Sequence, residues 1–218
     1  MNVEIDSRLR ADAERNRGRI TDAARHLFAT QGLDVSMASV ARAAGVGKAT
    51  LARRFATQGD LIAAVFEDRM RAYVRATELA LAESDPWLGF VHYIEGVCSM
   101  QAADRGFADV LTTSFNGADL LEELRVQAYK GFLEVIERAR STGHLRADFV
   151  SEDLFVILLA NAAVVAATAD VTDAAWRRLV GHMLRAFATP DAPLPPLPPA
   201  PSSADLEKAM SRIGVSKA

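Results

Sequence analysis

The sequence predicts an all-α protein of about nine helices, arranged as two helical domains followed by a short tail. Three observations support this fold class. Apolar residues recur three and four positions apart along most of the 218-residue chain, as they do on one face of an α-helix. Glycine, proline and capping side chains separate these segments. No run alternates between apolar and polar residues as a half-buried strand would.

The first helices have clear start and stop signals. Gly32 follows the first helix as a C-terminal cap, and Ser36 is expected to cap the second. Residues 48–55 form a third short helix, and Thr57 or Asp60 begins a long fourth one. The apolar face of the first helix comprises Ile20, Ala23, Ala24, Leu27 and Phe28.

The second half of the chain continues in the same way. Pro86 begins a helix, since proline suits the first turn and not the interior. Gly143 ends another helix, and Ser151 offers an N-cap to an apolar one. The remaining helices are expected over residues 87–98, 107–111, 121–139, 154–169 and 174–188.

Composition changes after Pro190. Six prolines between residues 193 and 201 predict an extended polyproline II segment without a core. Such a segment is compatible with an SH3-like ligand, but a spacer is favoured. We therefore expect residues 190–218 to form a flexible tail, with a weak helix over residues 206–213.

Charge is unevenly distributed along the chain. Residues 1–60 contain ten basic and seven acidic side chains, whereas the remainder contains 15 and 21. The overall net charge of −3 argues against a protein that coats nucleic acid, while the basic N-terminal region permits sequence-specific DNA binding.

Several features favour the cytoplasm. Cys98 is the only cysteine, so no internal disulfide can form. Residues 1–19 are polar and do not resemble a signal peptide. The apolar stretch 155–168 is interrupted by Asn161 and is short for a bilayer, so we predict a buried helix and no membrane partner.

Residues 36–55, SMASVARAAGVGKATLARRF, place two short helices around a tight turn at Gly45. Small Ala41 permits a close crossing, and Val40, Val46 and Leu51 would hold the helices together. This layout predicts a helix-turn-helix, whose second helix enters the major groove of DNA. The expected DNA-binding residues are Ser36, Gly47, Lys48, Ala49, Thr50, Arg53 and Arg54.

At these positions the sequence resembles the TetR family of transcriptional regulators. The resemblance covers residues 14–73 and implies that residues 74–189 form a ligand-binding and dimerisation domain. It also implies a homodimeric repressor, released from operator DNA by a small-molecule effector, with no cofactor. The matching positions are Ile20, Ala23-Ala24, Leu27-Phe28, Gly32, Val40-Ala41, Ala44-Gly45-Val46, Thr50-Leu51, Phe55 and Asp60-Leu61.

Two phosphate anchors usual in that family are missing. Ala52 stands where a tyrosine is usual, and Gln58-Gly59 stands where a lysine is common. Our hypothesis is that Arg53 and Arg54 compensate, together with Arg15, Arg17 and Arg19 of an N-terminal arm. The alternative is that the arm arginines only solvate the first helix.

The resemblance implies that the last two core helices form the dimer interface, as a four-helix arrangement with the partner chain. A two-fold dimer then requires a palindromic operator. The alternative for the apolar helix is a place in the internal core. The expected interface residues are Leu158, Val165, Trp176, Leu179, Val180, Met183 and Phe187.

An effector pocket should combine apolar surface with a few polar groups. Asn161 is the strongest candidate, because a buried amide needs a partner, which its counterpart across a dimer could also supply. The alternative for each candidate is that it packs in the hydrophobic core and contacts no ligand. The candidates are Phe90, Tyr93, Cys98, Met100, Phe107, Phe115, Tyr129 and Asn161.

Two other classes of function compete with this interpretation of the sequence. An enzyme is disfavoured, because Ala49 stands where a phosphate-binding loop needs Ser or Thr, and the four histidines lack metal-ligand spacing. A helical interaction protein that has lost DNA binding is the second alternative, favoured by Ala52 and Gln58.

Overall fold

The computed structural model describes residues 2–113, 117–168 and 170–215, and confirms the all-α prediction. Over these residues there is no strand, only one isolated antiparallel bridge between Leu145 and Ala188. The helices, in chain order, are α1 (Asn2–Gln31), α2 (Met37–Ala43), α3 (Lys48–Arg54), α4 (Gln58–Ala82), α5 (Pro86–Ala103), α6 (Arg105–Thr112), α7 (Asp119–Ser141), α8 (Ser151–Thr168), α9 (Ala174–Phe187) and α10 (Ser203–Val215).

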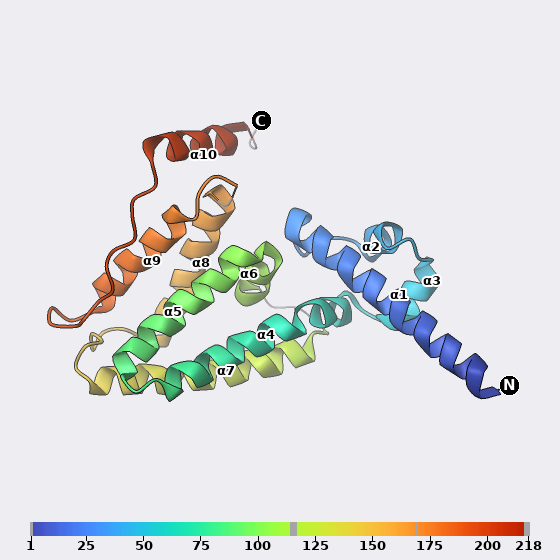
Figure 1. Ribbon diagram of the computed structural model, residues 1–218, viewed down its shortest axis with the longest axis horizontal. Coiled ribbons are helices and arrows are strands. Elements are labelled where there is room, and N and C mark those ends of the chain that lie inside the picture. Colours follow the sequence, from blue (N-terminus) through green and yellow to red (C-terminus); the bar gives the residue numbers. More distant parts are fainter. Residues whose placement is uncertain (1, 114–116, 169, 216–218) are drawn as a thin grey trace.

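The helices form two groups, joined by α4 (Figure 1). α1, α2 and α3 lie together at one side, and α5 to α9 form the larger group. The side chains of Ile20, Ala24 and Phe28 on α1 are buried, so the predicted apolar face of the first helix packs inward. Gly32 adopts a positive φ of 81° after the last turn, the conformation expected of a glycine C-cap.

α4 begins at a complete capping box. The Thr57 hydroxyl accepts a hydrogen bond from the Asp60 backbone N–H at 3.0 Å, and the Asp60 carboxylate accepts one from the Thr57 N–H at 2.8 Å. Further along, α4 lies beside α7 (Figure 1). A Cβ at Gly131 of α7 would lie 2.5 Å from Thr77 Oγ1, so glycine is what allows this close approach.

Aromatic side chains fill the core of the larger group. Tyr93 of α5 stacks on Phe132 of α7, with ring centroids 4.9 Å apart. Phe149, just before α8, meets the ring of Phe90 edge-on at 5.2 Å and that of Phe187 at 4.9 Å. These contacts join α5, α7 and α9 through one aromatic cluster, in geometries that aromatic pairs favour.

The predicted flexible tail differs from the structure. Residues 190–202, which we call the proline segment, are extended, but three of their carbonyls accept hydrogen bonds from the body of the protein. Trp87 Nε1 donates to Pro193 O at 2.6 Å, Arg185 Nη2 to Pro195 O at 2.8 Å, and Arg178 Nη1 to Pro198 O at 2.7 Å. Proline has no N–H, yet its carbonyl remains an acceptor.

The chain then ends in α10, which is longer than the predicted weak helix. α10 packs against α8 through Ala209, which is buried. Arg212 Nη1 lies 3.4 Å from the carboxylate of Asp170, beyond the end of α8.

Trp87→Phe tests the attachment of the proline segment. An aromatic ring remains, but the hydrogen bond to Pro193 is lost and the smaller ring leaves space at this fully buried position, so we expect the free energy of unfolding to fall by about 2–3 kcal/mol. Backbone amides of this segment should also exchange faster in hydrogen exchange measured by mass spectrometry. Trp176→Phe is the matched control, because the buried Trp176 Nε1 has no hydrogen-bond partner among the described residues. Equal exchange in both variants would contradict the attachment.

Candidate nucleic-acid interface

The turn between α2 and α3 has the geometry of a helix-turn-helix. Gly45 has a φ of 62°, and its N–H donates to Arg42 O at 3.1 Å, while Val46 N–H donates to Ala41 O at 3.0 Å. Val40, Ala41 and Leu51 are buried. Of the residues predicted to hold the two helices together, Val40 and Leu51 are therefore in the core, and Val46 is half-buried against it.

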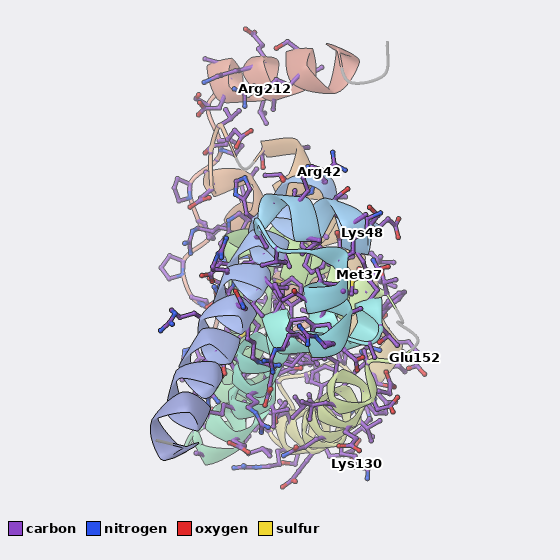
Figure 2. All side chains as sticks on the ribbon, turned by 90° about the vertical axis from the view of Figure 1, so that its right-hand side faces the viewer. Met37, Arg42, Lys48, Lys130, Glu152 and Arg212 are labelled. Carbon is purple, nitrogen blue, oxygen red and sulfur yellow. The ribbon has the colours of Figure 1, made fainter. Side chains whose placement is uncertain are left out.

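α3 presents its basic side chains to solvent. Successive residues of a helix are rotated by about 100°, so Ala49 and Arg53 lie opposite the buried Leu51. Arg53 is thus the long side chain at the centre of the outward face. Lys48 and Arg54 are exposed at the first and last positions of α3, and Thr50 is half-buried. Figure 2 looks onto this end of the molecule, with Lys48 at the surface.

Two predicted contact residues also have structural roles. The Ser36 hydroxyl caps α2 by accepting a hydrogen bond from the Ser39 N–H at 3.2 Å. Gly47 is the N-cap residue of α3, and its carbonyl accepts hydrogen bonds from Thr50 N–H at 3.0 Å and Leu51 N–H at 3.1 Å. Both residues are exposed, so these roles leave their surfaces accessible.

The three arginines assigned to an arm lie within α1, because this helix begins at Asn2. Arg19 Nη2 donates to the carbonyl of Gly45 at 3.3 Å, and the Arg17 guanidinium lies 5.1 Å from the centroid of the Phe55 ring. The expected separate arm is therefore wrong. Arg17 and Arg19 hold α1 against the turn before α3 and the residue after it, and Arg15 is exposed on the same helix.

Gln58 has a role that the sequence did not indicate. Its side-chain amide donates to Leu33 O at 2.6 Å and to Val35 O at 3.4 Å. This amide ties the start of α4 to the loop between α1 and α2. At the position where the family resemblance implies a lysine, this chain therefore has an internal hydrogen-bonded link. Ala52, where the resemblance implies a tyrosine, is exposed on α3.

α6 contacts the N-terminal group of helices directly. Phe107 of α6 packs against Phe66 of α4, and Phe66 stacks on Phe28 of α1, with centroid distances of 6.4 Å and 6.0 Å. A Cβ at Gly106 would lie 2.8 Å from the Phe66 ring, so the contact depends on glycine. Phe107, predicted to line a pocket, instead belongs to this junction.

A half-buried carboxyl group lies at the same junction. Partial burial raises the pKa of Asp109, the negative charge of Asp34 raises it further, and Arg105 opposes both effects. The carboxylate of Asp109 also lies near Gly32, in the loop after α1. The ionised form of this carboxyl group is therefore disfavoured where the two groups of helices meet.

The described residues among the pocket candidates lie in different environments. Phe90, Tyr93, Cys98 and Asn161 are buried inside the larger group. Tyr129 is 47% exposed, and its hydroxyl lies 3.1 Å from Ser151 Oγ, so its assignment to a pocket is wrong. Met100 is half-buried at the edge of a groove between α4 and α5, and Phe115 lies outside the described residues.

Asn161 links α8 to α5. Its Nδ2 donates to Cys98 O at 3.1 Å and to Gln101 Oε1 at 3.0 Å, and Gln101 Nε2 donates to Leu158 O at 3.2 Å. Asn161 Oδ1 and the Tyr93 hydroxyl have no hydrogen-bond partner among the described residues. Burial raises the pKa of Cys98 to about 12, so its thiol is neutral.

Four of the seven predicted dimer residues belong to the core of their own chain. Leu158, Val165, Trp176 and Val180 are buried inside their own chain, so they cannot meet a partner. Leu179, Met183 and Phe187 are half-buried. α8 instead exposes its opposite face, where Phe155, Val156 and Leu159 are 49%, 60% and 46% exposed. Helical periodicity showed that these helices are apolar, but not which face meets the core.

α8 is the one helix among the described residues that is long and apolar enough to cross a membrane. Its 18-residue span has a mean hydropathy of 1.6, and a third of it is buried within the protein. Asn161, with its hydrogen bonds to α5, lies in the middle of this span.

Comparisons with known proteins agree with this architecture. Residues 20–65 match the family of bacterial regulatory proteins, tetR family. A TetR transcription regulatory protein from Mycobacterium vanbaalenii is 32% identical, over 83% of this chain and 99% of that one, with a TM-score of 0.45. No curated protein matches the chain.

Two further solved structures are similar. A TetR transcriptional regulator from Streptomyces coelicolor is 26% identical, over 80% of this chain and 99% of that one, with a TM-score of 0.50. The regulator FadR from Bacillus subtilis, solved in complex with stearoyl-CoA, is 18% identical, over 78% of this chain and 97% of that one, with a TM-score of 0.51.

The helix-turn-helix and its helical C-terminal domain define a transcriptional regulator of the DNA-binding, ligand-sensing class. Residues 20–65 match the family, and the identity to the mycobacterial regulator extends over almost its whole length. The chain therefore belongs to the TetR family.

Asp109→Asn tests the junction between α6 and the loop after α1. The folded protein holds the pKa of this carboxyl above the usual 3.8, so its contribution to stability is complete below that pH and is lost as the pH rises through the raised pKa. We therefore expect the variant to have a higher melting temperature than the wild type at pH 7, with a smaller difference at pH 4. The exposed Asp68→Asn is the control, and an equal gain there would contradict this account.

Proposed function

We propose that this regulator is a cytoplasmic, non-enzymatic repressor that binds a palindromic operator as a homodimer and is released by a small-molecule effector. The observation that carries this proposal is the outward face of α3, which exposes Arg53, while Lys48 and Arg54 are exposed at the two ends of the same helix. No resident cofactor is required for this activity.

The chemistry of α3 suits operator recognition. An arginine can bond both acceptors of guanine in the major groove, a contact worth roughly 1–3 kcal/mol of discrimination. Arg53 is placed for this role, with Arg54 beside it, and Lys48 and Thr50 at the start of the helix suit phosphate oxygens. Arg19, through its bond to Gly45, would fix the angle at which α3 leaves the turn.

The exposed face of α8 supports dimerisation. Phe155 and Leu159 lie on successive turns with Val156 beside them, and the exposed Ala163 and Ala166 continue the same face. Covering such an apolar surface by a second copy through a two-fold axis removes it from water. A two-fold dimer would also present two copies of α3 to DNA, which supports a palindromic operator.

Release by an effector is supported by the class of fold. The Bacillus subtilis regulator, which has a similar fold, was solved in complex with stearoyl-CoA, so a small molecule binds that protein. In this chain, α4 would transmit the signal, since it packs against α5 and α7 and also against α1. The coupling free energy expected for such release is about 1–3 kcal/mol.

Arg53→Ala tests operator binding. In a gel-shift titration with DNA from upstream of the protein's own gene, we expect affinity to fall about 5- to 150-fold, because a bidentate base contact is lost. Lys130→Ala, which removes an exposed charge from α7, is the control and should bind as the wild type does. A folded wild-type dimer that shifts no promoter fragment would favour the alternative, an interaction protein that has lost DNA binding.

Leu159→Asp tests the dimer face. A buried unpaired carboxylate is strongly unfavourable, so we expect a monomer in analytical ultracentrifugation with unchanged helical content. Leu79→Asp is the matched control, because Leu79 of α4 is 72% exposed and lies off this face. A dimer that survives Leu159→Asp, or one that Leu79→Asp disrupts, would place the interface elsewhere.

A further inference from the structure

A groove of about 510 Å³ runs between α4 and α5. The two helices are consecutive and antiparallel, joined by a short turn after Ala82 (Figure 1). Small residues form much of its lining, including Ala72 and Ala76 on α4 and Gly96 on α5. The predicted pocket residues Tyr93 and Met100 also line it.

The groove is closed at the end near the turn. A Cβ at Gly89 would lie 2.4 Å from the carbonyl oxygen of Ala80, so the helices touch there. His92 Nδ1 lies 3.6 Å from the Glu83 carboxylate across the same end. Two turns further along α5, a Cβ at Gly96 would meet no atom within 4 Å, so the helices are separated at that point.

The lining is apolar and incompletely covered. Leu79, on the α4 edge, is the most exposed large apolar side chain among the described residues, at 72%. Met100 lies half-buried on the opposite edge. The Tyr93 ring is buried, yet its hydroxyl has no hydrogen-bond partner among the described residues. An apolar molecule lying in the groove would cover Leu79 and remove this surface from water.

The charge beside the groove selects the kind of ligand. Arg75 lines it and is exposed, and no ion pair or hydrogen bond joins its guanidinium to another described residue. Glu83 lies at the closed end, where it would repel an anion. An anionic group is therefore favoured beside Arg75, with the apolar body lying along the groove. The α4 side of the groove from Ala72 to Ala80 is about 12 Å long.

We propose that this groove binds an elongated apolar molecule with a carboxylate or similar anionic end, held by Arg75 and seated over Gly96. Binding itself is independent of the proposed function. That such a molecule acts as the effector rests on the proposed function. Its route to the DNA-binding helices would be α4, whose Gln58 is hydrogen-bonded to the loop before α2.

Decanoate and decanol form a matched pair of probes for isothermal titration calorimetry on the full-length protein. We expect decanoate to bind more tightly than decanol. Gly96→Leu should weaken decanoate at least tenfold, because the added side chain occupies the groove, and the space around Gly96 allows the protein to fold. Circular dichroism and ultracentrifugation verify that it does.

Two arginine variants distinguish the effect of removing the positive charge in the groove from that of removing a positive charge elsewhere on α4. Arg75→Gln should weaken decanoate about tenfold and leave decanol unchanged. Arg71→Gln is the matched control, because Arg71 is on the same helix but is paired with Glu67 at 2.8 Å, and it should change neither. No decanoate binding, unchanged binding to folded Gly96→Leu, or equal effects of the two arginine variants would each overturn the proposal.

A gel shift with operator DNA distinguishes failure of the groove proposal from failure of the proposed function. Decanoate binding that depends on Gly96 and Arg75 in a protein that shifts no DNA would uphold the groove and contradict the proposed function. Operator binding without any decanoate binding would uphold the proposed function and overturn the groove. Operator release by decanoate in the wild type, and not in Gly96→Leu, would support both.

Discussion

The packing of α4 against both groups of helices is the constraint on which the rest of the structure depends. Its first half buries Leu61, Ile62 and Phe66, and its second half lies along α5 and α7. The capping box at Thr57 fixes where the helix begins, and the Gln58 amide fixes that start against the loop before α2. The position of the recognition helix α3 therefore depends on α4, the helix that follows it in the chain.

Much of the fold could be predicted from the sequence because its signals are local. Ser36, Gly32 and Pro86 mark helix ends through their own backbone preferences, and the structure places helix boundaries beside each. The exposed basic face of α3 follows from the same short-range logic, since seven residues and one buried leucine determine it.

Other features depend on contacts between residues that are far apart in the chain, and such contacts could not be predicted from the sequence. Trp87 and Pro193 are 106 positions apart, so nothing near either residue indicates their hydrogen bond. The buried face of α8 could not be identified from the sequence, because this helix is apolar on every side. The rotation of that helix is set by Asn161, whose amide must face the carbonyl of Cys98. With Asn161 turned inward, Phe155 and Leu159 lie outward.

The proline segment has a consequence for the surface of the protein. Its carbonyls accept hydrogen bonds from arginine and tryptophan side chains, while six of its residues from 193 to 201 have no N–H to donate. An extended chain with ordinary residues would offer a row of donors and acceptors to which another strand could add. Proline interrupts that row, so this segment can lie extended against α9 without becoming the edge of an intermolecular sheet.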